Sequence, residues 1–486
     1  MKKQTIVADM KEEGVNIRHH WSSCISVGQA CEGLRTDWVK QLTIAVKECG
    51  FRYIHLNGLL SDNMFVYYED EGISYYNWQY IDCLFDTLLE TGIRPFVEFG
   101  FMPDDLARGK TTMFWWEANI TPPKDYQRYG NLIFALLKHW AERYGMHEIH
   151  KWYFEVWSKA NQAEYWAGTQ EEYFKLYEVT ANTLRMISKQ LRIGGPSISL
   201  GPKEDGLGED IAWLQEFLSY CTVNKLPLDF ISIHAYGPIY ETLSKLKEVV
   251  QDSEYKTAKL YVTEFCSSES HRDYNHDGMP MAAYLLHHNL KTLGIVQALS
   301  YRGLSDLSED VKGPPKSFHG GMGLINMQGI MKPSYHAYRM LHLLGKSLVK
   351  KEEGYIITKT PEGEVRAVFY NFPAQLEQTL PQSPYPYQDV AKETELLGDK
   401  RKVDITLHNV KPESTLVLEV LDAKHGNIMK RWRALGSPTV LALYEVKEFK
   451  ELAQATMKLY FTADEEGTVR IQFTLRPYAI ASLVED

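Results

Sequence analysis

The chain has 486 residues and a net charge of −10, from 63 acidic and 53 basic side chains. Its lysines and arginines form no sustained run, which argues against a nucleic-acid partner, because contact with a phosphate backbone needs clustered cations. No stretch of about eighteen apolar residues occurs, so no membrane-spanning helix is expected. The length suggests about two to three domains.

The six cysteines are scattered through apolar segments. This spacing is typical of buried thiols in a reduced protein and not of a disulfide framework. Two lysines follow the first methionine, but no apolar run of the length found in signal peptides comes after them. We therefore expect a cytoplasmic protein from the sequence as given, or a periplasmic or secreted one if a signal was removed.

Strand-like and helix-like patterns alternate eight times in the first two thirds of the chain. Strands are expected at residues 21–28, 51–58, 94–100, 151–157, 191–197, 228–236, 259–266 and 294–304. Helices are expected at residues 34–48, 77–91, 122–143, 170–190, 209–223, 240–252, 281–293 and 332–344. Eight such units favour an α/β fold of the closed (β/α)₈ barrel type over an open doubly wound sheet. We assign this barrel to residues 19–345.

Beyond residue 345 the pattern changes to short alternating strands separated by turn signals. Strands are expected at residues 354–372, 402–409, 415–421, 457–461 and 468–475. This pattern is typical of a β-sandwich, which we assign to residues 346–486. The N-terminal residues 1–18 are expected to join the sandwich, and residues 378–398, which contain three prolines, to form a long loop.

Polar residues follow several of the predicted barrel strands, at the end where barrel enzymes carry their active site. Glu264 is the most informative of them, because a carboxylate after four largely apolar strand residues is costly to bury unless it is paired or used. Glu155 lies in the middle of a strand, so we expect it to form a buried salt bridge inside the barrel. The other candidates at strand ends are Asn57, Ser61, Ser158, Lys159, His234, Tyr236 and Arg302.

Seven segments of the predicted barrel carry a family resemblance. They are ECGFRYIH at 48–55, RPFVEFGFMP at 94–103, NITPPKDY at 119–126, KWYFEVW at 151–157, ISIHAYG at 231–237, VTEF at 262–265 and KPSYHAY at 332–338. In these segments and their order the chain resembles glycoside hydrolase family 39, the β-xylosidase family, over nearly the whole barrel. The resemblance implies a retaining glycosidase of the (β/α)₈ type that acts on an oligosaccharide or glycoside without a cofactor, and it is consistent with a homo-oligomer.

In that family two glutamates share the catalysis. The resemblance maps the nucleophile, at the end of the seventh strand, onto Glu264. The acid/base belongs to an Asn-Glu-Pro turn after the fourth strand, and this chain has Ser158, Lys159 and Ala160 there. Lys159 is therefore expected at the acid/base position.

Other positions of the implied substrate site also differ from the family. Asn57 and Ser61 replace two histidines, and Arg302 replaces a tryptophan. His234 and Tyr236 match the family. With Ser158, these side chains are expected to bind the substrate.

The departures leave two hypotheses open. A retaining glycosidase needs two carboxyl groups about 5–5.5 Å apart, and a lysine with an ordinary pKa near ~10.4 is a weak acid and an unsuitable base. The chain is then either a glycosidase whose acid is relocated or supplied by the substrate, or a glycan-binding pseudoenzyme. The nearest candidates for a relocated acid are Glu164, Asp306 and Glu309.

The pseudoenzyme hypothesis includes a ligand preference. Lys159 and Arg302 would both be new cations in the pocket, which would suit an acidic or sulfated sugar. Lys159 is expected to lie beside Glu264 if the backbone follows the family, and the alternative is that it points into solvent.

One loop has a partial metal-binding pattern. Residues 273–278, DYNHDG, match the first half of a calcium loop, but the twelfth position is Tyr284 instead of a glutamate. We therefore expect an ordinary loop after the seventh strand and no metal site.

Overall fold

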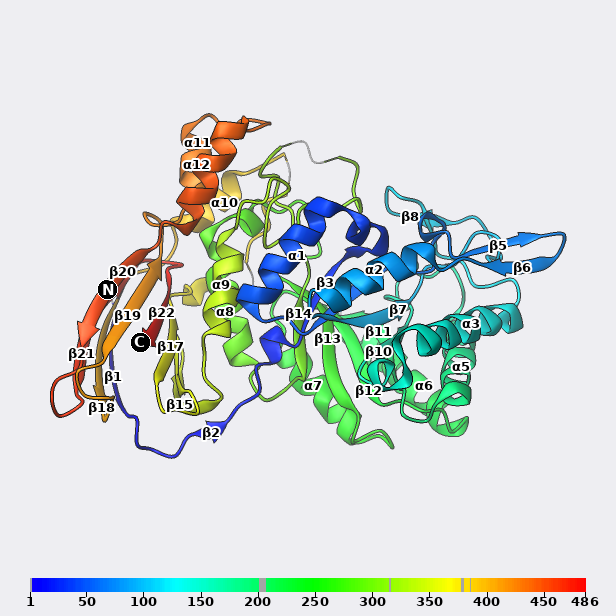
Figure 1. Cartoon of the computed structure of the whole chain (residues 1–486), viewed down its shortest axis with the longest axis horizontal. Coiled ribbons are helices and arrows are strands. Elements are labelled where there is room, and N and C mark those ends of the chain that lie inside the picture. The colour runs from blue at the N-terminus through cyan, green and yellow to red at the C-terminus, as the bar shows by residue number, and fades with distance from the viewer. Residues whose placement is uncertain (1, 201–206, 314–315, 377–379, 385) are drawn as a thin grey trace.

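The computed structural model describes residues 2–200, 207–313, 316–376, 380–384 and 386–486. The chain forms a large barrel and a smaller β-sandwich that lies beside it, and both chain ends lie in the sandwich (Figure 1). No helix of the described ranges is both long enough and apolar enough to cross a membrane. All six cysteines are free thiols, and four of them are buried.

The barrel consists of eight parallel strands in the order β14-β13-β12-β11-β10-β7-β4-β3. Their bounds are β3 (Cys24–Gln29), β4 (Tyr53–Asn57), β7 (Arg94–Phe99), β10 (Tyr153–Val156), β11 (Arg192–Leu200), β12 (Phe230–Tyr236), β13 (Lys259–Cys266) and β14 (Ala298–Tyr301). A parallel bridge between Ser26 and Arg302 joins the first strand to the last, and the amide of Gly303 donates to the carbonyl of Ser26 at 2.9 Å. The predicted (β/α)₈ barrel is confirmed.

Helices cover the outside of the barrel between successive strands (Figure 1). They are α1 (Thr36–Cys49), α2 (Gln79–Glu90), α3 (Tyr126–Tyr144), α5 (Gln170–Ile187), α6 (Gly208–Val223), α7 (Tyr240–Gln251), α8 (Met279–Lys291) and α9 (Pro333–His342). Local chemistry sets several of their ends. Thr169 and Glu172 form a reciprocal capping box at the start of α5, and Gly50, with φ of 69°, ends α1 in the left-handed conformation. Every predicted barrel strand and helix overlaps its observed counterpart.

The loops of the barrel contain short elements that periodicity did not predict, because each spans too few residues to produce a pattern. The strands and α-helix among them are β5 (Tyr67–Asp70), β6 (Ile73–Tyr76), β8 (Thr112–Met113), β9 (Ala118–Asn119) and α4 (Met146–Ile149). The 3₁₀ helices are η1 (His20–Ser22), η2 (Ala30–Leu34), η3 (Asp62–Met64), η4 (Tyr274–Asp277) and, outside the barrel, η5 (Ala374–Leu376).

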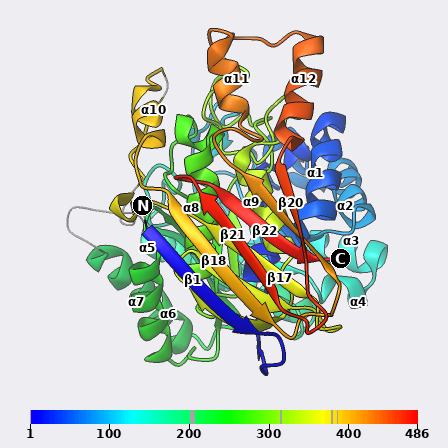
Figure 2. The ribbon, with the colours of Figure 1, turned by 90° about the vertical axis from the view of Figure 1, so that its left-hand side faces the viewer.

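The sandwich consists of two sheets with strand orders β1-β18-β21 and β2-β15-β16-β17-β22-β19-β20 (Figure 2). Their bounds are β1 (Lys2–Asp9), β2 (Val15–Asn16), β15 (Ser347–Glu352), β16 (Tyr355–Lys359), β17 (Val365–Tyr370), β18 (Arg401–His408), β19 (Thr415–Leu421), β20 (Met457–Thr462), β21 (Val469–Leu475) and β22 (Ile480–Glu485). Alternate side chains such as Ile357, Ile405 and Leu418 form one buried cluster. The N-terminal strand β1 pairs in parallel with β18, and β2 pairs with β15.

Three helices of the C-terminal part were not predicted. The expected loop at 378–398 contains α10 (Asp389–Glu395), so that prediction is wrong for these residues. Two further helices, α11 (Ile428–Ala434) and α12 (Leu443–Gln454), extend from the sandwich between β19 and β20 (Figure 2). Trp432 and Phe449 pack against Phe318 of a barrel loop, with ring centroids 5.6 and 5.9 Å apart. These helices therefore depend on a tertiary contact.

A buried ion triad holds the loops after β13 and β14. The ammonium of Lys332 lies 2.6 Å from carboxylate oxygens of both Asp277 and Asp306, and all three side chains are fully buried. The carboxylates in turn accept from the amides of Gly320, at 2.7 Å, and Gly323, at 2.8 Å. The triad therefore joins the start of α9 to two loops beside the carboxyl end of the barrel.

Replacing Lys332 by methionine should destabilise the protein strongly. The substitution keeps much of the side-chain volume but leaves two buried carboxylates without a counterion, which costs about 3–5 kcal/mol. Urea denaturation of the parent and of Lys332→Met gives the difference in the free energy of unfolding. The exposed Lys256→Met is the matched control, and a loss no larger than that of the control would contradict a stabilising role for the triad.

Candidate functional site

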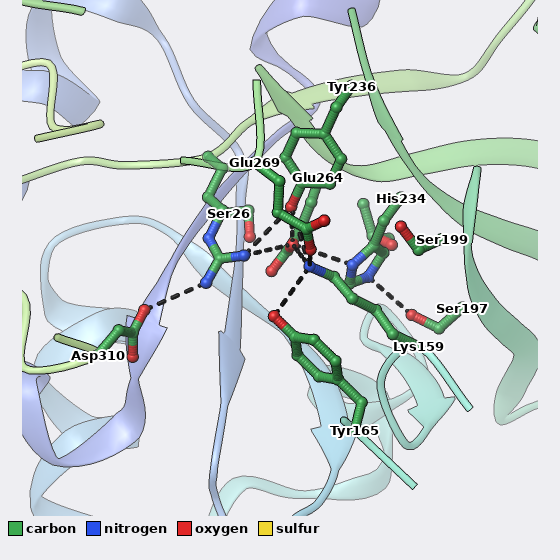
Figure 3. A network of polar contacts seen from close by, with 12 residues as sticks. Ser26, Lys159, Tyr165, Ser197, Ser199, His234, Tyr236, Glu264, Glu269 and Asp310 are labelled. Carbon is green, nitrogen blue, oxygen red and sulfur yellow. Dashed lines mark hydrogen bonds and ion pairs between the residues drawn. The ribbon is translucent and has the colours of Figure 1, made fainter. Parts of the chain in front are cut away.

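Four side chains from the carboxyl ends of the barrel strands meet in one buried cluster (Figure 3). Glu264 lies on β13, and Tyr236 is the last residue of β12. Lys159 follows β10, and Arg302 follows β14. Residues far apart in the sequence are brought together here because all barrel strands run in the same direction.

Glu264 is the centre of this cluster. Its Oε2 accepts a hydrogen bond from the Tyr236 hydroxyl at 2.5 Å and lies 2.8 Å from a guanidinium nitrogen of Arg302. The same oxygen is 3.0 Å from Nδ1 of His234 and 3.4 Å from the ammonium of Lys159. Burial raises the pKa of Glu264, but the charges of its neighbours outweigh burial and hold the pKa well below its ordinary value. Glu264 is therefore an ionised carboxylate.

Lys159 is fully buried and does not point into solvent. Its ammonium forms ion pairs with Glu264 and Glu269 and hydrogen bonds, each 3.2 Å long, with the hydroxyls of Tyr165 and Tyr236. It also lies over both tyrosine rings, 4.5 and 5.0 Å from their centroids. Burial lowers the pKa of Lys159, but the neighbouring tyrosines and carboxylate raise it well above its ordinary value. The lysine therefore retains its proton.

Arg302 is the second cation of the cluster and has two carboxylate partners. Its other terminal nitrogen lies 3.1 Å from Asp310, in addition to its contact with Glu264. The indole of Trp116 donates to Asp310 at 3.2 Å. Burial lowers the pKa of the neighbouring His271 to about 4, with a further contribution from the charge of Arg302, so this imidazole adds no charge at neutral pH.

A comparison with known proteins identifies the lineage of this site. A sequence model of the glycosyl hydrolases family 39 matches residues 4–470. The chain belongs to glycosyl hydrolase family 39. It is 32% identical to the β-xylosidase of Geobacillus stearothermophilus over 448 residues, which cover 87% of this chain and 84% of that protein.

Two further relatives match over almost their whole lengths. The chain is 32% identical to the β-xylosidase of Caldicellulosiruptor saccharolyticus over 496 residues, 96% of this chain and 95% of that protein. The structure of the family 39 enzyme from Xanthomonas axonopodis pv. citri superimposes with a TM-score of 0.91 at 27% identity, and covers 100% of this chain and 98% of that one. The protein is thus a family 39 glycoside hydrolase of the β-xylosidase-like kind.

The three sequence candidates for a relocated acid in this family 39 chain do not contact Glu264 or Lys159. Asp306 is paired with Lys332. Glu309 accepts from Gln29 at 2.7 Å and lies 3.5 Å from Arg35, and Glu164 is exposed.

Besides Glu264, the carboxylates that contact Lys159 and Arg302 are Glu269 and Asp310, and sequence reasoning missed both. Glu269 lies in the loop five residues after Glu264, so a search of the loop after the seventh strand would have included it. Burial raises the pKa of Glu269, but the charge and hydrogen bond of Lys159 outweigh burial and lower it. Glu269 is therefore a carboxylate, and not an acid, in this arrangement.

The remaining predicted substrate-binding residues are buried at the same end of the barrel. Asn57 ends β4, and Ser61 and Ser158 lie in loops. Within the described part of the chain, the amide oxygen of Asn57 and the hydroxyl of Ser61 have no hydrogen-bond partner. Both atoms are thus available to a ligand, whereas their assignment to the substrate stays a prediction.

The cavity beside this cluster is small. It has a volume of about 40 Å³ and is lined by Arg302, Asp310, His271 and His319, among others. This is room for a few water molecules, whereas small-molecule sites enclose roughly 300–1,000 Å³. A groove of about 570 Å³ lies between α6 and α7, and none of the candidate site residues lines it. The cavity beside the cluster is therefore too small to hold a sugar ring by itself.

The calcium-like loop and one buried cluster contain potential metal ligands. Oδ1 of Asp273, in the calcium-like loop, accepts from the amides of Asn275, at 3.1 Å, and Ser383, at 3.0 Å, and its Oδ2 accepts from the hydroxyl of Ser268 at 3.2 Å, so both oxygens already have protein partners. One buried group of described residues has its nitrogen and oxygen atoms close enough together for a metal ion, within 4.8 Å. This group consists of His55, Glu98, Glu155 and His234.

His55 lies close to both carboxylates of this group. Nε2 of His55 lies 2.6 Å from Glu155 and 3.5 Å from Glu98. Burial lowers the pKa of His55, but Glu155 outweighs it and raises the pKa to about 9. Burial raises the pKa of Glu98 to about 8. At neutral pH the group therefore consists of a His55–Glu155 ion pair, as expected for Glu155, beside a neutral Glu98.

Replacing Glu98 by glutamine should flatten the pH dependence of stability. Between the ordinary pKa of 4.5 and about 8, Glu98 carries a proton in the folded protein but not in the unfolded chain. Its contribution to the free energy of unfolding is therefore complete below pH 4.5 and is lost as the pH rises towards 8. Denaturation curves at several pH values, with the exposed Glu216→Gln as control, test this. An unchanged slope would contradict the neutral state of Glu98.

Proposed function

We propose that this chain is an atypical retaining glycosidase of the β-xylosidase type, in which Glu264 is the nucleophile and Lys159 stands at the acid/base position. The single observation that carries the proposal is the position of the Lys159 ammonium, buried 3.4 Å from Glu264. The substrate is a glycoside or oligosaccharide, in keeping with the family. His234, Tyr236 and Arg302 orient and hold the nucleophile.

The substitution has a defined chemical cost. In the first step, the leaving oxygen receives no proton from a carboxylic acid, and Lys159, with its raised pKa, releases a proton reluctantly. General acid catalysis contributes typically 10²–10⁴-fold. Such an enzyme acts best on glycosides whose leaving group needs no protonation, and an activated aryl glycoside is the appropriate first substrate.

The same lysine also weakens the nucleophile. Oε2 of Glu264 has four polar neighbours, two of which are permanent cations. Attack on the anomeric carbon moves negative charge from this carboxylate onto the substrate, so the ion pairs stabilise the reactant more than the transition state. Removal of the Lys159 charge should therefore help the first step even without a new acid.

Replacing Lys159 by glutamate should raise activity towards aryl β-xylosides. The substitution removes the ion pair and supplies a carboxyl group close to Glu264, as a retaining mechanism requires. We expect an increase of about 10²-fold in kcat/KM, largest for the poorest leaving group. Initial rates over a series of aryl leaving groups measure it.

Two matched variants separate the effect of losing the Lys159 charge from the effect of gaining an acid. Lys159→Gln removes the charge without adding an acid and should give a smaller increase that does not depend on the leaving group. Lys159→Glu combined with Glu264→Gln should lose the increase altogether. An increase that survives loss of the Glu264 carboxylate would overturn its assignment as nucleophile.

A second candidate function is glycan binding without hydrolysis, and the ion pair between Lys159 and Glu264 favours it because it weakens the nucleophile. The charges of the cluster around Glu264 do not support an acidic or sulfated glycan as the ligand. Lys159 and Arg302 are both paired with carboxylates, namely Glu264, Glu269 and Asp310. The two cations therefore provide no excess positive charge, and a neutral glycan suits the cluster better.

Calorimetry with xylo-oligosaccharides distinguishes the two candidates. If the protein only binds glycans, the parent should show saturable binding while chromatography detects no product after prolonged incubation. Tyr165→Phe removes one hydrogen bond to Lys159 and should change the dissociation constant of the glycan by no more than a few-fold. Release of xylose at any rate that Glu264→Gln abolishes would rule out the binding-only candidate.

A further inference from the structure

A second cavity lies at the opposite end of the barrel, where strands β3 and β4 begin. It has a volume of about 470 Å³, and its lining includes Arg18, His19, Arg52, His342 and Lys346. We refer to these five side chains as the basic pocket. None of them belongs to the site around Glu264.

The basic pocket lies where the chain passes between sandwich and barrel. The chain enters the barrel after β2, through Ile17 and His19, and returns to the sandwich between α9 and β15, through Gly345 and Lys346. The amide of Ile17 donates to the carbonyl of Lys346 at 2.8 Å. Nε2 of His19 is 3.0 Å from the carbonyl of Gly345. The two crossing segments are thus hydrogen-bonded to each other beside the pocket.

The permanent charges of the basic pocket are not compensated by protein carboxylates. Arg18 contacts the side-chain oxygen of Gln297, and Arg52 donates to the hydroxyl of Ser23 at 2.8 Å. Both partners are neutral. In the described ranges no carboxylate forms an ion pair with Arg18, Arg52 or Lys346, and the pocket lining contains none. This concentration of positive charge stands out in a chain with a net charge of −10.

The carboxyl ends of two helices compensate only part of this positive charge. The helix α1 ends at Gly50 and α9 ends at His342, and both residues line the pocket. The carboxyl end of a helix carries about −0.5 of a unit charge and favours nearby cations. Two such ends offset about one unit, whereas the pocket contains three permanent cations. The helix ends therefore offset only part of the charge of Arg18, Arg52 and Lys346, whose side chains are exposed and can reach a ligand.

His19 and His342 are two titratable groups of the basic pocket. Burial lowers the pKa of His19, and the positive charges of Lys346 and Arg52 lower it further. Burial also lowers the pKa of His342. Both imidazoles are therefore mostly neutral at neutral pH, and an anion beside them would raise their pKa values by favouring the protonated form.

We propose that the basic pocket binds a small anion that carries a phosphate or sulfate group. The guanidinium groups of Arg18 and Arg52 suit a tetrahedral oxyanion, because arginine can donate two parallel hydrogen bonds to it. The cavity is large enough for an organic ester of such an anion as well as for the inorganic ion. A bound anion contacts both crossing segments at once and so stabilises the junction of barrel and sandwich. This binding is independent of the chemistry proposed at Glu264.

Calorimetry on the full chain tests the proposal, with inorganic phosphate, inorganic sulfate and glucose 1-phosphate as separate probes. Sodium chloride keeps the ionic strength constant. We expect one saturable site, and at least tenfold weaker affinity in the double variant Arg52→Gln, Lys346→Gln. The control is the double variant Lys256→Gln, Lys458→Gln, which removes two exposed cations elsewhere and should bind as the parent does. Tighter binding of the sugar phosphate than of both inorganic ions would identify an ester as the preferred ligand.

A second measurement follows the histidines of the parent protein itself. Histidine resonances of the parent, assigned with His19→Gln and His342→Gln, should show that saturating phosphate raises the pKa of both imidazoles. Chloride at the same ionic strength should not. Equal effects of chloride and phosphate, or equal phosphate affinity in the Arg52, Lys346 variant and the parent, would overturn the proposal. Neither outcome bears on Glu264, so the proposed function is tested separately.

Discussion

The ion pair between Lys159 and Glu264 places two opposite charges inside the carboxyl end of this barrel. Both side chains are almost completely buried, and removal of an ion from water costs several kcal/mol even after the protein relaxes. The cost is tolerable only if every buried charge has a partner. The additional contacts of Lys159 with Glu269, and of Arg302 with Asp310, follow from that requirement.

The same requirement operates at two further places in the barrel. Inside it, His55 and Glu155 form an ion pair while Glu98 is held neutral by its raised pKa. Beside it, Lys332 satisfies two carboxylates from different loops. Charge pairing therefore fixes the loops after β13 and β14, and those loops supply the counterions of the candidate site. The position of Glu264 depends on a network that extends beyond its direct neighbours.

The two ends of the barrel differ in their charge balance. At the carboxyl end, Lys159 and Arg302 are paired with Glu264, Glu269 and Asp310, beside a cavity of about 40 Å³. At the amino end, Arg18, Arg52 and Lys346 line a larger cavity and have no carboxylate partner in the described ranges. An anionic ligand is thus favoured at the junction with the sandwich and disfavoured at the cluster around Glu264.

The sequence by itself determined the barrel, the accessory sandwich and the family, because strand and helix periodicity is local and the family segments follow one another in order. It also placed Glu264 and Lys159 at strand ends, since parallel strands present their carboxyl ends at one level. Only the tertiary structure decided that Glu269 and Asp310 are the counterions, that α11 and α12 form against Phe318, and that three distant cations share one pocket. Partners in loops are chosen by proximity in space, for which the sequence contains no periodic signal.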